Sequence, residues 1–147
     1  MNTSRWRDER GAVLAVELVA CAPLLAAFIL LIIFGGRIAL ANQAVQTAAA
    51  DAARAASIAR TAASARSQAS EWASTSLANQ GLRCIRVQVD VDTSGFSRPV
   101  GTPAEVSVRV SCDIDTADLS LPGIPGSVPV EASMSSPLDK YRERARR

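Results

Sequence analysis

The chain has 147 residues, a formal net charge of +2 and no histidine. This length allows one modest domain, and the small net charge gives no sign of a nucleic-acid partner. The missing histidine removes the commonest general base and the commonest metal ligand. Because only 4% of the residues are aromatic, a large conventional core is not expected.

The first predicted element is an apolar run over residues 12–34, AVLAVELVACAPLLAAFILLIIF. A membrane-spanning helix needs about 20 consecutive apolar residues, so this run predicts one. Glu17 is its only charged residue. A carboxylate at such depth costs about 2.5–3.5 kcal/mol on insertion scales, so a functional reason for Glu17 is expected. Pro23 and the pair Gly35-Gly36 are the expected positions of a kink.

The residues that flank the run predict its orientation. Arg5, Arg7 and Arg10 precede it, whereas Arg37 is the only basic residue that follows closely. The positive-inside rule therefore favours an N-terminus in the cytoplasm and a C-terminus outside the cell. The expected location is the cell membrane, crossed once.

Two other interpretations of the run are weaker. A cleaved secretory signal has an apolar part of about 7–15 residues and a small-x-small cleavage site, whereas this run is longer and has no clear site at its end. Residues 18–21 (LVAC) fit the residue types of a lipoprotein signal, but Glu17 interrupts the segment before Cys21, and the most apolar part follows it. In the favoured interpretation, Cys21 faces lipid or another helix.

An alanine-rich segment follows the apolar run. Residues 38–79 contain neither proline nor glycine, and alanine is the best helix former, so one continuous helix is predicted. Gly81 is a plausible stop just past its end. The small side chains allow close helix packing, which favours a packing surface in a helical filament. A simple spacer remains the alternative.

The next segment predicts strands. Alternation of apolar and polar residues over Cys84–Asp92 and Ala104–Cys112 predicts an antiparallel hairpin, with a turn region at Thr93–Pro103. Leu119–Pro129 is predicted as a loop, and Val130–Ser135 as a short third strand. A hairpin needs such a third strand for independent stability. The predicted fold class is α+β: a long N-terminal helix followed by a small antiparallel tip of two or three strands.

Cys84 and Cys112 are an even pair in a segment predicted to be exported, so a disulfide is expected. The antiparallel register would bring the two ends together, and closing this loop stabilises by about 3–4 kcal/mol in the chain-entropy model. Two free buried thiols are the alternative. No catalytic constellation, cofactor site or metal site is predicted, because no serine has a partner histidine and no phosphate loop or calcium loop occurs.

Specific residues around the apolar run resemble a known family. They are Gly11, Val16-Glu17-Leu18, Pro23-Leu24-Leu25, Phe34-Gly35, Ala41-Asn42-Gln43-Ala44 and Ala52-Ala53-Arg54-Ala55-Ala56. This pattern resembles the TadE family, the minor pilins and pilus-assembly proteins of tight-adherence (Flp-type) type IV pilus systems. The cysteine-bridged strands and Asp139-Lys140-Tyr141-Arg142 also resemble its actinobacterial members.

The resemblance implies a prepilin peptidase cut near Gly11, at the cytoplasmic face. Counted from a cut after Gly11, Glu17 is sixth, whereas the family glutamate is usually fifth; a cut after Ala12 gives fifth, so both positions are candidates. Glu17 would then register subunits by pairing with a neighbour's new N-terminal amine. The implied partners are the lipid bilayer, the major pilin, other Tad-type minor pilins, assembly-platform proteins and the prepilin peptidase.

The expected organisation has five parts. They are a cytoplasmic leader-like segment (1–11), a transmembrane helix (12–36), an extracytoplasmic alanine-rich helix (37–80), a small antiparallel tip (81–136) and a charged C-terminal tail (137–147). The predicted function is a non-catalytic TadE-like minor pilin or pilus-assembly protein, either assembled into a surface pilus or retained in the membrane. The alternative is a signal-anchored envelope protein whose strand tip binds a ligand or a surface polymer.

Overall fold

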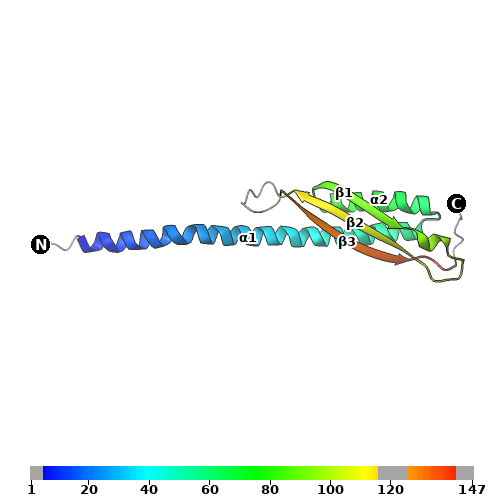
Figure 1. The fold of residues 1–147 in the computed structure, drawn as a ribbon, viewed down its shortest axis with the longest axis horizontal. Coiled ribbons are helices and arrows are strands. Elements are labelled where there is room, and N and C mark those ends of the chain that lie inside the picture. The colour runs from blue at the N-terminus through cyan, green and yellow to red at the C-terminus, as the bar shows by residue number, and fades with distance from the viewer. Residues whose placement is uncertain (1–4, 116–125, 142–147) are drawn as a thin grey trace. The chain divides into compact units, whose positions relative to one another are not determined.

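The computed structural model describes residues 5–115 and 126–141, and for residues 5–18 and 20 it describes the backbone alone. The elements in chain order are α1 (Arg5–Ile58), α2 (Ala62–Asn79), β1 (Cys84–Asp92), the short 3₁₀ helix η1 (Ser94–Ser97), β2 (Glu105–Asp115) and β3 (Ser127–Pro137) (Figure 1). The predicted α+β class is therefore confirmed. The chain divides into two compact units, Met1–Arg37 and Ile38–Arg147, which are described separately.

The first unit contains the N-terminal part of α1 and confirms the predicted apolar helix. Pro23 lies inside α1 without ending it, and Gly35 and Gly36 are helical as well. A proline removes one backbone hydrogen bond of a helix and clashes with the preceding turn, but long apolar helices tolerate it where neighbouring groups satisfy the freed carbonyl.

The second unit begins with a helical hairpin, and here the prediction of one continuous helix over residues 38–79 is wrong. Instead, α1 ends at Ile58 and α2 begins at Ala62. Thr61 has extended backbone angles (φ −132°, ψ 153°), and its hydroxyl accepts a hydrogen bond from the Ser64 N–H at 3.1 Å. This N-cap stabilises the new helix start. The turn lets two alanine-rich faces bury each other, and such tertiary packing overrides intrinsic helix propensity.

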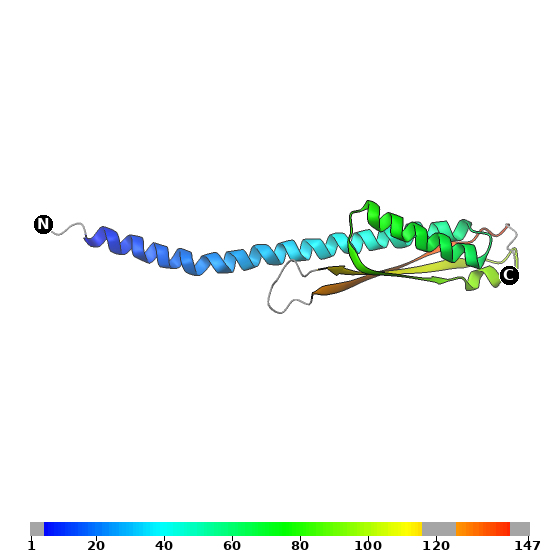
Figure 2. The same cartoon turned by 90° about the horizontal axis from the view of Figure 1, so that it is seen from above.

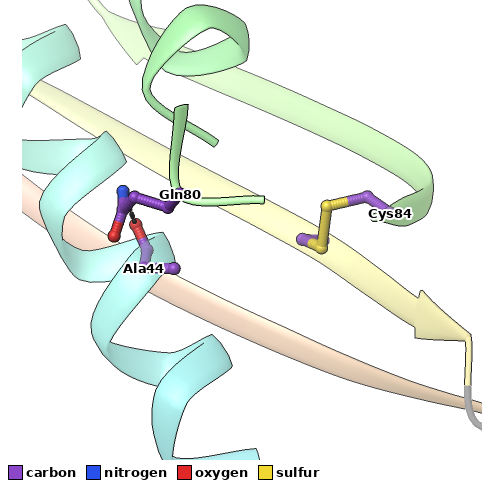
Figure 3. The surroundings of a disulfide bond; sticks show 4 residues. Ala44, Gln80 and Cys84 are labelled. Atoms are coloured by element: carbon purple, nitrogen blue, oxygen red, sulfur yellow. Dashed lines mark hydrogen bonds between the residues drawn. A yellow bond between two sulfur atoms is a disulfide. The ribbon is translucent and has the colours of Figure 1, made fainter. Parts of the chain in front are cut away.

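Polar contacts fix the antiparallel pairing of the two helices. The Ser76 hydroxyl donates to the Asp51 carboxylate at 2.8 Å, and the Gln80 amide donates to the Ala44 carbonyl at 3.2 Å (Figure 3). Most of the buried residues of the two paired helices are alanines with almost no exposed surface, among them Ala48, Ala52 and Ala69. Alanine side chains allow the helix backbones to approach closely.

A three-stranded antiparallel sheet completes the second unit, with the order β1-β2-β3. The predicted bounds of β1 are confirmed, whereas β2 continues past the predicted end at Cys112 to Asp115. The predicted third strand is also confirmed, but β3 starts at Ser127, inside the segment predicted as a loop. Because β2 is central, it carries the most buried strand residues: Val106, Val108, Val110 and Cys112 have no exposed surface.

The helical hairpin covers one face of the sheet (Figures 1 and 2). The other face is polar, as period-2 alternation requires; Asp90 on β1, for example, lies opposite Arg109 on β2. The second unit therefore has two layers, with its core between the helices and the sheet.

The connection between β1 and β2 is a turn region, as predicted, and it contains η1. Phe96 of η1 is buried, and the Leu138 N–H donates to the Ala104 carbonyl at 2.8 Å, which ties the segment after β3 to this connection. Residues 119–125 of the predicted loop, residues 142–147 of the predicted tail and residues 1–4 of the predicted leader lie outside the described residues.

Candidate functional site

The apolar surface of the first unit is the most unusual feature of the described chain. Most of the large apolar side chains described there are substantially exposed, from 45% for Ile33 to 72% for Val19 and Leu24, whereas Leu30 and Phe34 are partly buried. The remaining exposed members are Leu25, Phe28, Ile29, Leu31 and Ile32. These side chains point to all sides of the helix rather than to one stripe, and a helix that is apolar all round belongs in a membrane or inside an assembly.

The length and composition of this helix are sufficient to cross a membrane. Among the described residues, one helical segment meets that test, Cys21–Ile58, with a mean hydropathy of 2.5 over its most apolar stretch. The core helix of a water-soluble protein passes the same test, but only 6% of that stretch is buried within this structure. The exposed apolar surface therefore favours a membrane anchor over a core helix. Its orientation is not fixed by the fold.

The predicted site residues of the first unit lie on α1. The backbone of Gly11, Ala12 and Glu17 is helical, and their side chains lie outside the described part of the structure. Glu17 lies six helical positions after Gly11, a rise of about 9 Å along the axis. Cleavage next to Gly11 or Ala12, and registration of subunits by Glu17, stay predictions.

The predicted disulfide is present in the second unit. Cys84 and Cys112 are bonded, with their Cα atoms 5.4 Å apart (Figure 3). In the strand register Cys112 lies opposite Val87, and an irregularity between Cys84 and Arg86 shifts the register at the start of β1. The third cysteine, Cys21, is free and exposed.

A shallow open depression beside the β1–β2 connection gathers several polar groups. Its volume is about 510 Å³, and it is lined by Asp92, Ser94, Gly95, Arg98, Pro103, Ala104, Glu105, Ser107 and Pro137. The Asp92 carboxylate accepts a hydrogen bond from the Ser94 N–H at 2.9 Å. This backbone bond, together with one from the Ser94 side chain, lowers the pKa of Asp92. Its carboxylate thus holds the turn in shape.

The acidic residues near the strand ends do not form a metal centre in the described part of the chain. Across residues 5–115 and 126–141, no three His, Cys, Asp or Glu side chains lie close enough together to hold a metal ion. The Asp51 carboxylate is occupied by the Ser76 hydroxyl between the two helices, so its role is structural.

Sequence reasoning missed two contacts that hold the second unit together. Thr61 caps α2, and the Arg66 guanidinium donates to the buried Thr93 hydroxyl at 2.8 Å. The capping residue has a recognisable pattern, because threonine is favoured at helix starts. The contact between Arg66 and Thr93 joins residues 27 positions apart, and no local pattern announces it.

A comparison with known protein families gives a match over the part of the chain that contains the exposed apolar surface. The model of the TadE-like protein family matches residues 12–54, a range that contains Glu17 and the whole exposed apolar segment. No curated protein and no solved structure matches the chain significantly. The chain is therefore similar to the TadE-like protein family over this segment, which covers 43 of its 147 residues.

Proposed function

We propose that this chain is a non-catalytic minor pilin or pilus-assembly protein of a Flp-type (tight-adherence) type IV pilus system, held in the cell membrane by its apolar helix. One observation carries the proposal. The segment matched by the TadE-like family contains the stretch of α1 whose large apolar side chains are mostly exposed around the helix. Such a surface requires lipid or neighbouring helices around it.

Glu17 supports an assembly role over a passive anchor. A buried charge is stable only where a partner of opposite charge compensates its desolvation. A prepilin peptidase cut next to Gly11 or Ala12 would create a new N-terminal amine, and pairing of that amine with Glu17 of a neighbouring subunit would set the subunit register. The candidate bonds and Glu17 lie on one helix, α1.

The second unit would lie outside the membrane, on the extracytoplasmic side. Two observations support this orientation: the cluster of arginines before the apolar run, and the bond between Cys84 and Cys112, because disulfides persist in oxidising compartments. The proposed partners are the major pilin, other minor pilins and the assembly platform.

Intact-mass analysis of the chain from its native host, combined with shearing of surface filaments, tests the proposal. A chain that has lost residues 1–11 or 1–12 and is found with sheared filaments is a minor pilin. A full-length chain that stays in the membrane, in a host that loses its pili when the gene is deleted, is an assembly protein. A full-length chain whose deletion leaves normal pili contradicts the proposal and favours the signal-anchored envelope protein.

A further inference from the structure

The two sulfur atoms of the disulfide differ in how a second protein could reach them. Cys112 lies on the central strand β2, beneath the helical hairpin, and has no exposed surface. Cys84 is only partly buried and begins β1, an edge strand of the sheet. Figure 3 shows the bridge reaching inward from Cys84 to the central strand. Once the second unit has folded, Cys84 is the more accessible residue of the pair.

The side chain of the residue after Cys84 is mostly exposed and lies outside the buried core. Ile85 is 63% exposed although it belongs to an apolar and polar alternation that buries other residues of its strand. The register shift between Cys84 and Arg86 accounts for this exposure, because a β-bulge redirects the side chain at the extra residue. A single exposed isoleucine is ordinary on a protein surface, but this one directly follows Cys84, the partly buried cysteine of the disulfide.

We propose that a dithiol–disulfide oxidoreductase of the extracytoplasmic space installs this bridge through Cys84 and docks on the exposed side chain of Ile85. The inference rests on the extracytoplasmic placement of the second unit proposed above. It does not require that the chain assemble into a pilus. The partner is defined by its chemistry: an oxidised cysteine pair beside an apolar peptide-binding surface.

The reaction proceeds by two thiol–disulfide exchanges. The Cys84 thiolate attacks the disulfide of the oxidoreductase, so that a mixed disulfide forms and one cysteine of the oxidoreductase leaves as a thiolate. The Cys112 thiolate then attacks the Cys84 sulfur, which forms the structural bridge and releases the second cysteine of the oxidoreductase. Two electrons and two protons pass from the chain to the oxidoreductase, which ends as a dithiol.

The reverse order of attack conflicts with the packing. Cys112 neighbours Val110 and lies opposite Val87 in the sheet, with the helices covering that face. A mixed disulfide at Cys112 would require a second protein to enter the core. In the proposed order, Cys112 attacks the mixed disulfide at Cys84. The pairing of β1 with β2 already holds the two cysteines close together, since their Cα atoms are 5.4 Å apart in the final bridge.

The docking contact is tested with the reduced full-length chain in detergent micelles, reoxidised either by an oxidised thioredoxin-fold oxidoreductase or by glutathione disulfide. Ile85→Ser is expected to slow reoxidation by the oxidoreductase at least about threefold and to leave reoxidation by glutathione disulfide unchanged. Val100→Ser is the matched control, because Val100 is also an exposed apolar residue (53%) but lies in the β1–β2 connection. Equal slowing with both oxidants, equal slowing in both variants, or no slowing in Ile85→Ser overturns the docking contact.

The order of attack is tested with two single-thiol chains, both carrying Cys21→Ser. One retains Cys84 (Cys112→Ser) and the other retains Cys112 (Cys84→Ser). Intact mass after acid quenching measures the adduct with the oxidoreductase, and the chain that retains Cys84 is expected to form it at least about tenfold faster. Equal rates, or a faster reaction at Cys112, overturn the proposed order. Both experiments are independent of pilus assembly, so their failure is distinct from failure of the proposed function.

Discussion

The two units of the chain differ in what covers their apolar side chains. In the first unit Leu24 is 72% exposed and Leu31 63% exposed, whereas in the second unit Val106 and Val108 are completely buried. The second unit therefore satisfies its apolar residues internally, with two helices on one face of a sheet. The first unit is complete only with lipid or neighbouring helices around it. Folding of the second unit and the membrane or helix contacts of the first unit should therefore be separable. Mutations in one unit are expected to leave the other unaffected.

The core of the second unit is made of small side chains. Most of its buried helical residues are alanines, and its largest fully buried residues are valines and Cys112. Each such side chain removes little apolar area from water, so hydrophobic burial alone stabilises a unit of this size modestly. Local constraints, namely the disulfide, the Thr61 helix cap and the close approach of Gly95 to the Glu105 backbone, consequently carry a large share of its stability.

The largest expected effect comes from charges placed in the apolar helix. The double variant Leu25→Arg/Ile29→Arg puts two arginines on exposed positions of the first unit, at about 2.5–3.5 kcal/mol each in a membrane. We expect the chain to become extractable by alkaline carbonate. Leu40→Arg is the control, since Leu40 is equally exposed (69%) but lies beyond the apolar run. A double variant that resists extraction as well as Leu40→Arg does would contradict a membrane role for this surface.

Loss of the disulfide is expected to affect the second unit alone. Cys84→Ser combined with Cys112→Ser should lower its free energy of unfolding by about 3–4 kcal/mol, because the bridge closes a loop between residues 28 positions apart. Urea unfolding in micelles, followed by circular dichroism, measures the change. Cys21→Ser should leave the unfolding curve unchanged, because Cys21 is free. An equal loss in Cys21→Ser would mean that the two units are not separable.

Gly95 tests the turn that closes the core. A Cβ atom at this position would collide with the backbone carbonyl of Glu105, at the start of β2. Gly95→Ala should therefore destabilise the second unit by about 1–3 kcal/mol, as overpacking does elsewhere. Gly126→Ala is the matched control, because nothing lies within 4 Å of the added atom there. Equal unfolding midpoints for the two variants would show that the turn yields without cost.

The smallest expected effect is a dependence on pH. Hydrogen bonds from Ser94 lower the pKa of Asp92 below its usual value of 3.8. A lowered folded-state pKa contributes stability that is present above the unfolded value and is lost as the pH falls through the folded value. The advantage of the natural chain over Asp92→Asn should therefore be constant above pH 5 and shrink below about pH 4. An advantage that grows at low pH would contradict the assignment.

Much of the fold could be predicted from local pattern. The continuous apolar run of α1 and the period-2 alternation of β1 are local sequence signals, and both elements form where these signals predict them. The break between α1 and α2 was missed because the residues there include neither glycine nor proline, and only Thr61 indicates a helix start. The predicted third strand is shorter than β3 because the sequence prediction places Pro129 at the end of a loop, since proline usually interrupts a strand. β3 is an edge strand, where proline is tolerated.

Some residues of the candidate site could likewise be predicted from the sequence, and others could not. Glu17 could be singled out by residue type, because a carboxylate in an apolar run is rare, and the pairing of Cys84 with Cys112 followed from the predicted hairpin. The exposure of Ile85 could not be predicted, since period-2 alternation groups it with Val87 and Val89 on one face. The register shift between Cys84 and Arg86, which removes Ile85 from that face, arises from the pairing of β1 with β2 and has no local sequence signal.

The proposed assembly role rests on the Glu17 carboxylate, and one measurement tests it directly: the number of surface pili per cell in the native host when Glu17→Gln replaces the natural chain. Gln has nearly the shape of Glu but no charge to pair with an N-terminal amine. We expect pili to be lost while the variant chain remains in the membrane fraction at the natural level, and Glu17→Asp to restore part of the assembly. Normal pili in Glu17→Gln would contradict the claim that this carboxylate registers subunits.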